Sequence, residues 1–524
     1  MPPSVRRRRV HAVHLSVCFA SPRQYRLRNL RTRNGAQPSM QTDKATSGIL
    51  LAGVAKADIT NYESGPANDP LYTKALAIGD GTVTAVIVTV DAVSIGEIGS
   101  IRNDFLANVR TRLHESLGID PMGIVVNASH CHGSVCPDVE DRTIQAVTQA
   151  YQNMVPVRVG SGTGHEDRIS ENRRFKLADG TTADARRAYS LPADDQIAGV
   201  GPIDPEIGIL RLDREDGRRL AVVYNFACHP IMGVPNGGNT ADITGFTSKV
   251  IEENQADDTL AMFIQGCAGD INPKRYKDVE NPPDAEPLGN LLGLSVLQAL
   301  KGIESRDSAS LKIIREEIDL PREDLAPHIE RLQKEQTRLL QSLRPTDINF
   351  KTFLNLSLKR AVSPDFPSFY SHRYLHDRAA GRGDLDRLDA RNQESADRYL
   401  ANLHTMEKLT RLHANLRLLE MHHAQNVAAG SDTLQVEMVG LRIGDFVLIT
   451  FPGELSVEIG LGIKQRSPHP LTFVAGITNG YIYYSPTAEQ LKNRGGAQED
   501  SDCYLAAEWQ ALFEAKAADM LARV

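Results

Sequence analysis

The sequence has 524 residues, of which 41% are hydrophobic and 24% charged, so it can form a large core and is unlike fibrous, collagen-like or wholly disordered chains. Its formal net charge is −7, but residues 1–39 contain nine arginines and no acidic residue, which leaves −16 (−7 − 9) on the remainder. An acidic body excludes nucleic acid as the main partner, because phosphate contacts require a basic surface. No apolar run approaches the roughly 18–20 residues that cross a bilayer, so we predict no transmembrane segment.

Residues 1–47 are predicted to form a basic, disordered arm. Three readings of it stay open: a start codon assigned before the true start at Met40, an export signal, or a functional tail. The first is favoured, because His11 and His14 interrupt the apolar stretch that a signal peptide needs. Six cysteines are too few for a disulfide framework in a chain of this length. We therefore expect a cytoplasmic protein, with secretion as the alternative if residues 1–20 act as a signal peptide.

From residue 48 onward, short β-rich apolar runs alternate with amphipathic stretches, which is typical of an α/β fold with a mixed β-sheet core flanked by helices. Strands are predicted at residues 82–90, 123–128, 157–160, 207–212, 220–226, 260–265, 436–443, 446–451 and 471–477. Helices are predicted at residues 101–117, 143–153, 246–255 and 288–300.

Residues from about 320 to 430 have a different pattern, with apolar residues at helical spacing in the charged stretches 327–343 and 385–425. This pattern predicts an α-helical insertion, with a Pro- and Phe-rich break at 363–369 and a turn at 381–383. The insertion is interpreted as two packed amphipathic helices that cover one edge of the sheet. A lid or an oligomer contact is the alternative.

Several apolar runs end in polar clusters, and α/β sheets bind their ligands at the carboxyl ends of strands. The run at residues 124–133 ends in His130 and His132, which on an extended segment point the same way. Both can then face one metal ion, or one can bind the metal while the other acts on substrate. The run at 222–230 ends in His229, which supplies a third nitrogen.

Three further segments carry candidate chemistry. Glu454 follows the strand at 446–451 on a Pro-Gly turn and is a metal ligand, a general base or the cap of the next helix. The Gly-rich segment at residues 262–273 can present backbone N–H groups to an oxyanion. The segment at 479–484 places three tyrosines in four residues.

Taken in order, these motifs resemble the catalytic domain of the neutral/alkaline non-lysosomal ceramidases, in a divergent bacterial-type form, over about residues 48–485. The motifs are GVAKADIT at 53–60, NASHCH at 127–132, NR at 172–173, NFACHP at 225–230, QGCAGDINP at 265–273, FPGE at 451–454 and NGY at 479–481.

Members of that family are zinc amidases in which a metal-bound water attacks the amide. The resemblance implies that zinc is held by His130, His229, Glu454 and Tyr481. It places His132 and Arg173 beside the substrate and lets Tyr484 hydrogen-bond the developing oxyanion. Asn272 stands where the family has a serine, and it cannot supply a hydroxyl nucleophile. The chain ends about 40 residues after the tyrosine cluster, so we expect one domain over residues 48–524 and no C-terminal immunoglobulin-like domain.

The sequence therefore predicts a zinc-dependent hydrolase, active in lipid or sphingolipid metabolism, that cleaves the C–N amide bond of a ceramide-like or smaller N-acylated substrate. Three alternatives stay open: a zinc-dependent esterase or lactonase, a non-catalytic metal-binding homologue, and a thiol enzyme that uses Cys131, Cys228 or Cys267 as its nucleophile.

Overall fold

The computed structural model describes residues 49–255, 258–307 and 310–524. The predicted basic arm and the alternative start at Met40 lie outside these residues. Within the described part of the chain, no helix is long and apolar enough to cross a membrane.

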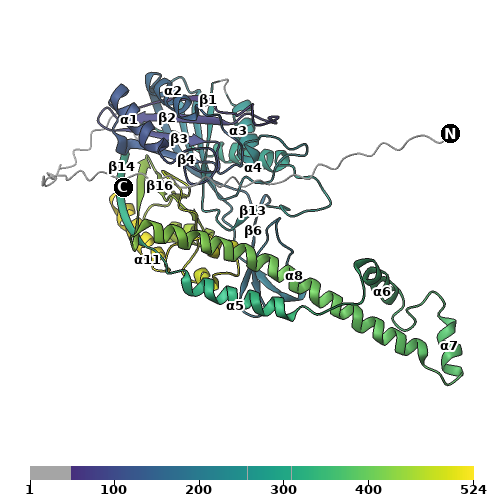
Figure 1. Ribbon diagram of the computed structural model, residues 1–524. Helices are drawn as coiled ribbons and strands as arrows, with labels where there is room; N and C mark the ends of the chain where they lie inside the picture. Colours follow the sequence, from purple (N-terminus) through teal and green to yellow (C-terminus); the bar gives the residue numbers. More distant parts are fainter. Residues whose placement is uncertain (1–48, 256–257, 308–309) are drawn as a thin grey trace, which may run out of the picture. The chain divides into compact units, whose positions relative to one another are not determined.

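A mixed sheet of eight strands forms the larger layer (Figure 1). Its strands are β1 (Leu50–Asp58), β2 (Tyr72–Gly79), β3 (Thr84–Val90), β4 (Ile124–Ala128), β5 (Val155–His165), β10 (Glu206–Arg214), β11 (Arg219–Phe226) and β12 (Leu260–Gln265). They lie in the order β12-β11-β10-β5-β1-β2-β3-β4. The outer pairs β3/β4 and β11/β12 are parallel and the inner pairs are antiparallel. Within each parallel pair, the carboxyl ends of the two strands therefore lie at the same edge of the sheet.

A second sheet packs against the first. It contains β14 (Leu311–Pro321), β15 (Thr433–Ile443), β16 (Phe446–Thr450) and β18 (Thr472–Ala475), in that order. Side chains alternate along the strands of the large sheet: Leu76 and Ile78 of β2 join a core with β15, β16 and β18, whereas Ala75 and Ala77 join the core on the opposite face. This alternation is the period of two that a strand buried on both faces requires.

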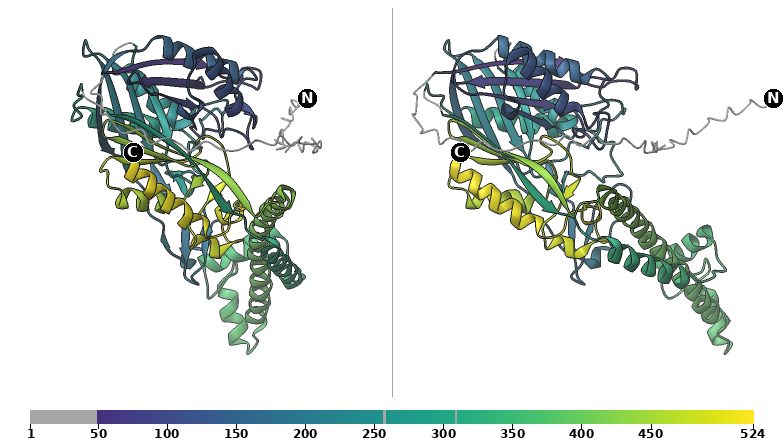
Figure 2. Two further views of the ribbon diagram at one scale, coloured as in Figure 1. Left: turned by 90° about the vertical axis from the view of Figure 1, so that its left-hand side faces the viewer. Right: turned by 60° about the vertical axis from the view of Figure 1, so that its left-hand side comes forward.

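Helices cover the outer faces of the two sheets (Figure 2). Helices α1 (Phe105–Leu117), α2 (Val139–Gln152), α3 (Asp242–Glu253) and α4 (Glu286–Leu300) lie on the large sheet, and α9 (Val457–Arg466) and α11 (Trp509–Arg523) lie on the small sheet. The result is four layers, helix–sheet–sheet–helix. The predicted α/β class with a mixed sheet flanked by helices is confirmed.

Short elements connect the layers and shape the candidate site. They are β6 (Ser170–Asn172), β7 (Arg174–Leu177), β8 (Thr182–Asp184), β9 (Ile197–Val200), β13 (Ile271–Pro273), β17 (Glu454–Leu455), β19 (Tyr484–Ser485) and α10 (Gln498–Ser501), with 3-10 turns at Pro121–Gly123, Asp194–Gln196 and Gln490–Asn493. Strand β13 pairs with β6, and β17 pairs with β19.

The predicted helical region contains α5 (Ala326–Ser342), α6 (Phe350–Val362), α7 (His372–Ala379) and α8 (Asp384–Ala429). Helix α8 has 46 residues and is therefore about 70 Å long. Helices α5, α6 and α7 pack along it, with α6 and α7 at the end remote from the sheets (Figure 1). The other half of α8 contacts the body, where Asn415 donates to the Gly495 carbonyl and His422 pairs with Asp502 at 2.6 Å.

Candidate active site

The candidate site lies where the two sheets meet, beyond the carboxyl ends of β4, β11, β12 and β16. His130 follows β4 by two residues, His229 follows β11 by three, and Glu454 follows β16 by four. The Ala128 N–H donates to the Ile477 carbonyl beyond β18 at 3.1 Å, which fastens the end of β4 to the small sheet. Strands of both sheets thus deliver their polar ends to one place, as expected for an α/β protein.

The backbone at the site is strained. His130 has φ 70°, and Ile477, Asn479 and Tyr483 also have positive φ between 49° and 61°. Non-glycine residues rarely adopt this left-handed conformation, which costs most for a β-branched residue such as Ile477. The predicted extended geometry of the His130 segment is therefore wrong. Its backbone N–H bonds instead to the Ala92 carbonyl at 2.9 Å, and this tertiary contact outweighs local propensity.

Three buried side chains form a cluster able to hold a metal ion. The ligand atoms of His130, His229 and Glu454 all lie within 4.8 Å of one another. The Glu454 Oε2 atom is 3.0 Å from His229 Nε2 and 3.4 Å from His130 Nε2. The capping reading of Glu454 is wrong, because α9 begins at Val457 with Ser456 as its cap. Strand β17 instead holds Glu454 beside the tyrosine segment.

Backbone carbonyls fix the orientation of both imidazoles. His130 Nδ1 lies 2.6 Å from the Val93 carbonyl oxygen, and His229 Nδ1 lies 3.0 Å from that of Ile271. A carbonyl oxygen only accepts, so each Nδ1 carries a proton, and each Nε2 is the ring nitrogen directed at the Glu454 carboxylate. Asp242, which lies 13 residues after His229, accepts hydrogen bonds from the backbone N–H groups of the loop at residues 232–233.

The charge states of the cluster favour a cation. Burial, reinforced by Arg173, lowers the pKa of His229 to about 3, so its imidazole is neutral. Burial acts to raise the pKa of Glu454, but the neighbouring His130 and His229 outweigh it and hold that pKa well below its usual value. Two imidazole nitrogens and one carboxylate thus lie together in a buried site. Nitrogen and carboxylate oxygen are ligands that a divalent cation such as zinc accepts, so the donor set fits a metal.

Tyr481 borders the same cluster. Its hydroxyl donates to Glu454 Oε1 at 2.5 Å, and burial followed by the nearby Glu454 carboxylate raises the phenol pKa well above its usual value. The contact brings the phenol oxygen beside the three cluster residues. Its role as a fourth metal ligand stays a prediction.

His130 and His132 occupy different environments. Their ring centroids are 5.6 Å apart and nearly perpendicular, and His132 is exposed whereas His130 is buried. Partial desolvation and then His130 lower the pKa of His132 to about 4, so its imidazole is neutral at pH 7. Of the two readings of the His-x-His motif, the arrangement favours one histidine in the cluster and the other beside it, at the solvent side.

Arg173 links the cluster to a buried polar layer. Its Nη2 donates to the Tyr484 hydroxyl at 3.1 Å, and its Nη1 donates to Asn272 Oδ1 at 3.1 Å. Four of its five N–H groups have protein partners, the others being Glu499 and the Gly269 carbonyl. Arg173 is 1% exposed, so it positions Tyr484 and Asn272. Its place beside the substrate stays a prediction.

Tyr484 and Asn272 have defined partners. Strand β19 places Tyr484 directly opposite Glu454, and desolvation followed by Glu454 raises the phenol pKa to about 12. The Tyr484 oxygen accepts from Arg173 and, at 3.5 Å, from Arg186, which leaves its own O–H free to donate. The Asn272 amide accepts from Arg173 and donates to the Ala185 carbonyl at 3.2 Å. Asn272 is therefore held in the framework of the site.

The sequence analysis missed a group of charged residues behind the predicted site. Glu499 accepts from Arg173 at 2.6 Å and from Arg186 at 2.8 Å, and Asp500 pairs with Arg174 at 2.6 Å. Burial acts to raise the pKa of Glu499, but the three guanidinium groups outweigh it and lower that pKa to about 2. The adjacent acidic pair at 499–500 and basic pair at 173–174 are the only local signal, and neither pattern is specific.

The thiol reading is not supported. Cys131, Cys228 and Cys267 are buried, and burial raises the pKa of each thiol far above its usual value. Thiolates are the reactive species, so these cysteines are suited to packing and not to nucleophilic attack. Cys18 lies outside the described residues.

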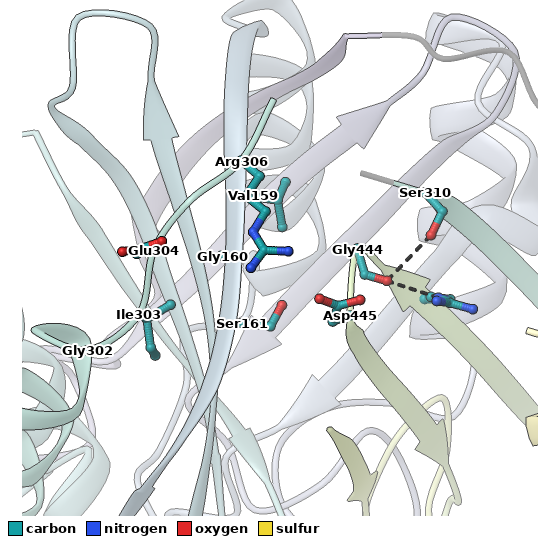
Figure 3. Close-up of a pocket in the computed structure, with 11 residues that line it drawn as sticks. Val159, Gly160, Ser161, Gly302, Ile303, Glu304, Arg306, Ser310, Gly444 and Asp445 are labelled. Atoms are coloured by element: carbon teal, nitrogen blue, oxygen red, sulfur yellow. Dashed lines mark hydrogen bonds between the residues drawn. The ribbon is translucent and has the colours of Figure 1, made fainter. Parts of the chain in front are cut away.

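A separate pocket of about 330 Å³ lies at the opposite end of β16 (Figure 3). The turn between β15 and β16 lines it, with Ser310 and Arg442 both hydrogen-bonded to the Gly444 carbonyl. Ser161 of β5 and Arg306 form the facing wall. None of its lining residues belongs to the candidate metal cluster, so this pocket is distinct from the candidate site.

Two solved structures share this fold. Neutral ceramidase from Pseudomonas aeruginosa matches with a TM-score of 0.57 and 14% identity over 91% of this chain and 74% of its own. A structure described as ceramidase complexed with C2 matches with a TM-score of 0.55 and 14% identity over 90% of this chain and 75% of its own. No family model matches the sequence, and no curated protein matches it. The chain therefore has a divergent form of the neutral ceramidase fold.

Proposed function

We propose that this protein is a zinc-dependent hydrolase that cleaves the C–N amide bond of an N-acylated substrate. The observation that carries the proposal is the buried set of two imidazoles and one carboxylate, whose ligand atoms all lie within 4.8 Å of one another and whose Nδ1 atoms are both engaged by backbone carbonyls. The fold likeness to neutral ceramidase supports amides as the substrate class. N-acylsphingosines are accordingly the first compounds to test.

In this proposal, His130, His229 and Glu454 hold the zinc, with the Tyr481 hydroxyl as the fourth ligand. Bound zinc supplies a water of lowered pKa, toward about 7, and polarises the scissile carbonyl. His132 is neutral and exposed, so it accepts a proton during attack and delivers it to the leaving nitrogen. Tyr484 donates its O–H to the carbonyl oxygen as negative charge develops there.

Position 272 offers no hydroxyl nucleophile, because it is an asparagine. Its side chain has no hydroxyl, and both ends of its amide are engaged by Arg173 and Ala185. The chain therefore offers no serine nucleophile at this position, and the reaction proceeds by direct attack of water without an acyl-enzyme step.

Metal analysis tests the proposal first. The wild-type protein, purified without chelators, is expected to contain about one zinc per chain, and His229→Ala is expected to contain none. His469→Ala serves as the matched control, because it removes a half-buried imidazole that bonds to the Leu521 carbonyl of α11 and does not belong to the candidate metal cluster. A wild-type protein without stoichiometric metal would contradict the proposal.

Turnover then identifies the reaction. Matched amide and ester substrates with the same acyl chain are incubated with the zinc-loaded protein, with His229→Ala and with His469→Ala. Hydrolysis of the amide by wild type and by His469→Ala, but not by His229→Ala, supports the proposal. Hydrolysis of only the ester indicates an esterase or lactonase, and full zinc occupancy without turnover indicates a non-catalytic metal-binding protein.

A further inference from the structure

One face of α6 is apolar and exposed. Phe350, Leu354, Leu358 and Val362 recur at every fourth position and so lie along one side of the helix. Their exposed fractions run from 50% for Leu354 to 78% for Val362. We call these four residues the α6 apolar face. Soluble proteins rarely expose so continuous a row of large apolar side chains without a partner for it.

The helix is attached through a different side. The Phe353 ring stacks on Tyr399 of α8, with 5.0 Å between ring centroids. The N-cap Asn349 bonds to the Thr352 N–H at 3.0 Å, so the first turn of α6 is fixed as well. The α6 apolar face is therefore presented by a helix held in place and is not the inner side of a helix that has failed to pack.

The charge around this face is positive. Residues 350–382 contain six lysines and arginines and two aspartates, a net charge of +4 with the histidines neutral. The adjoining stretch of α8, 384–398, has five acidic residues and three arginines, so residues 350–398 together carry +2, although the chain from residue 40 onward carries −16. Asp386 and Asp377 neutralise Arg378 and Arg382. Four basic residues of the segment form no ion pair with any described residue: Lys351, Lys359, Arg360 and Arg373.

Exposed aromatic residues accompany these cations. The Lys359 ammonium lies 4.2 Å from the centroid of the Phe369 ring, and the Arg373 guanidinium lies 4.6 Å from that of Tyr370. Phe369 is 81% exposed. Aromatic rings beside lysine and arginine are typical of protein surfaces that lie in the headgroup region of a bilayer.

We propose that α6 and the loop that follows it dock on an anionic lipid surface, with the α6 apolar face inserted at the boundary between headgroups and acyl chains. Leucine and phenylalanine on one side of a helix that also carries Lys351, Lys359 and Arg360 provide the two contributions that interfacial helices combine: burial of apolar surface and attraction to anionic headgroups. Helix α8 holds this surface at its end remote from the sheets, where the sheets do not obstruct contact with a membrane (Figure 1). This inference is independent of the proposed hydrolase activity.

Two other occupants fit less well. A second copy related by a two-fold axis would place the basic segment against itself, so like charges would meet. The chain's own N-terminal residues carry nine arginines and no acidic residue over 1–39, so their charge is not complementary to that of this segment. An anionic lipid surface is the occupant whose charge is complementary.

Vesicle sedimentation with the full-length protein tests the inference. We expect binding to phosphatidylcholine vesicles that contain about 30% phosphatidylglycerol, and weaker binding to phosphatidylcholine alone or at high salt. Leu354→Ser combined with Leu358→Ser should weaken binding at least about ten-fold, because two exposed leucines no longer enter the lipid. The matched control is Leu294→Ser with Leu512→Ser, which changes two exposed leucines of α4 and α11 and should bind as wild type.

Three results would overturn the inference. Wild-type protein could fail to bind anionic vesicles. The Leu354/Leu358 double variant could bind them as tightly as wild type, which would assign binding to the arginine-rich N-terminal residues or to another surface. Sedimentation velocity could show self-association that the double variant abolishes, which would make a second copy the occupant. Unchanged melting temperatures of both double variants exclude misfolding as the cause of any difference.

Discussion

Replacing Glu499 with glutamine removes one negative charge from behind the candidate site while keeping nearly the same shape. Burial alone would raise the Glu499 pKa, but Arg186, Arg173 and Arg174 lower it from 4.5 to about 2. The difference corresponds to about 3 kcal/mol of native-state stabilisation, which agrees with the roughly 3–5 kcal/mol lost when one partner of a buried ion pair is removed. The unfolding entropy of a chain of this size is about 1 kcal/mol per kelvin, so Glu499→Gln should lower Tm by about 3 °C.

The Glu499 pKa also predicts how the Tm difference between wild type and Glu499→Gln changes with pH. The folded-state pKa of Glu499 is depressed, so its contribution to the free energy of unfolding is fully present above pH 4.5 and is lost as the pH falls toward 2. The Tm difference between wild type and Glu499→Gln should therefore stay constant from pH 8 to pH 5 and narrow at pH 4. Scanning calorimetry from pH 8 to pH 4 measures this Tm difference.

A matched control separates burial from charge. Glu489 pairs with Lys492 at the surface, where its side chain is 79% exposed, so Glu489→Gln should change the unfolding free energy by less than about 0.5 kcal/mol. A Glu499→Gln protein that melts no lower than Glu489→Gln at pH 7 would refute the reasoning. So would a Tm difference that widens on acidification.

Three more predictions concern the site itself. Tyr481→Phe removes the hydroxyl that contacts Glu454, and it should lower zinc affinity by about 10–100-fold in a competition titration; unchanged affinity would remove Tyr481 from the ligand set. Gly269→Ala would place a methyl group 2.5 Å from the Glu454 carbonyl oxygen, so it should destabilise the fold by about 1–3 kcal/mol and reduce metal content, unlike an alanine at Gly199, where nothing lies within 4 Å. Cys131 and Cys228 should resist iodoacetamide in the native protein and react after unfolding, as read by peptide mass spectrometry; rapid native modification would restore the thiol reading.

The sequence predicted those elements whose pattern is local. Strand β12 has the predicted bounds, and β4 differs by one residue, because both are short apolar runs buried on both faces. Strand β14 was missed: it forms the edge of the small sheet, and a run of charged residues interrupts its apolar pattern, among them Arg315, which pairs with Glu437. Helices α6 and α7 were missed because the region around the predicted break buries few of its apolar residues.

The residues of the candidate site differ in the same way: some have a local signal in the sequence and others have none. Residues that end a strand, such as His130, His229 and Glu454, stand out because an apolar run stops at a polar residue. Glu499 does not, because it meets Arg173 across 326 positions of sequence and no pattern in either segment requires the other. The left-handed backbone of His130 has no local signal either, since glycine, the usual marker of that conformation, is absent there.

The strained residues explain how the candidate metal cluster of His130, His229 and Glu454 depends on the packing of the two sheets. Asn479, at φ 59°, bonds through its side chain to the Val126 N–H of β4 at 2.7 Å and to Glu437 of β15 at 2.6 Å, so one residue ties the large sheet to the small one. His130 leaves β4 immediately beyond this tie, whereas Glu454 leaves β16. Each left-handed residue costs about 1–3 kcal/mol, and these contacts between the sheets offset that cost. The distance between His130 and Glu454 is therefore set by the junction of the sheets, and loosening this junction would separate the ligands while leaving each sheet intact.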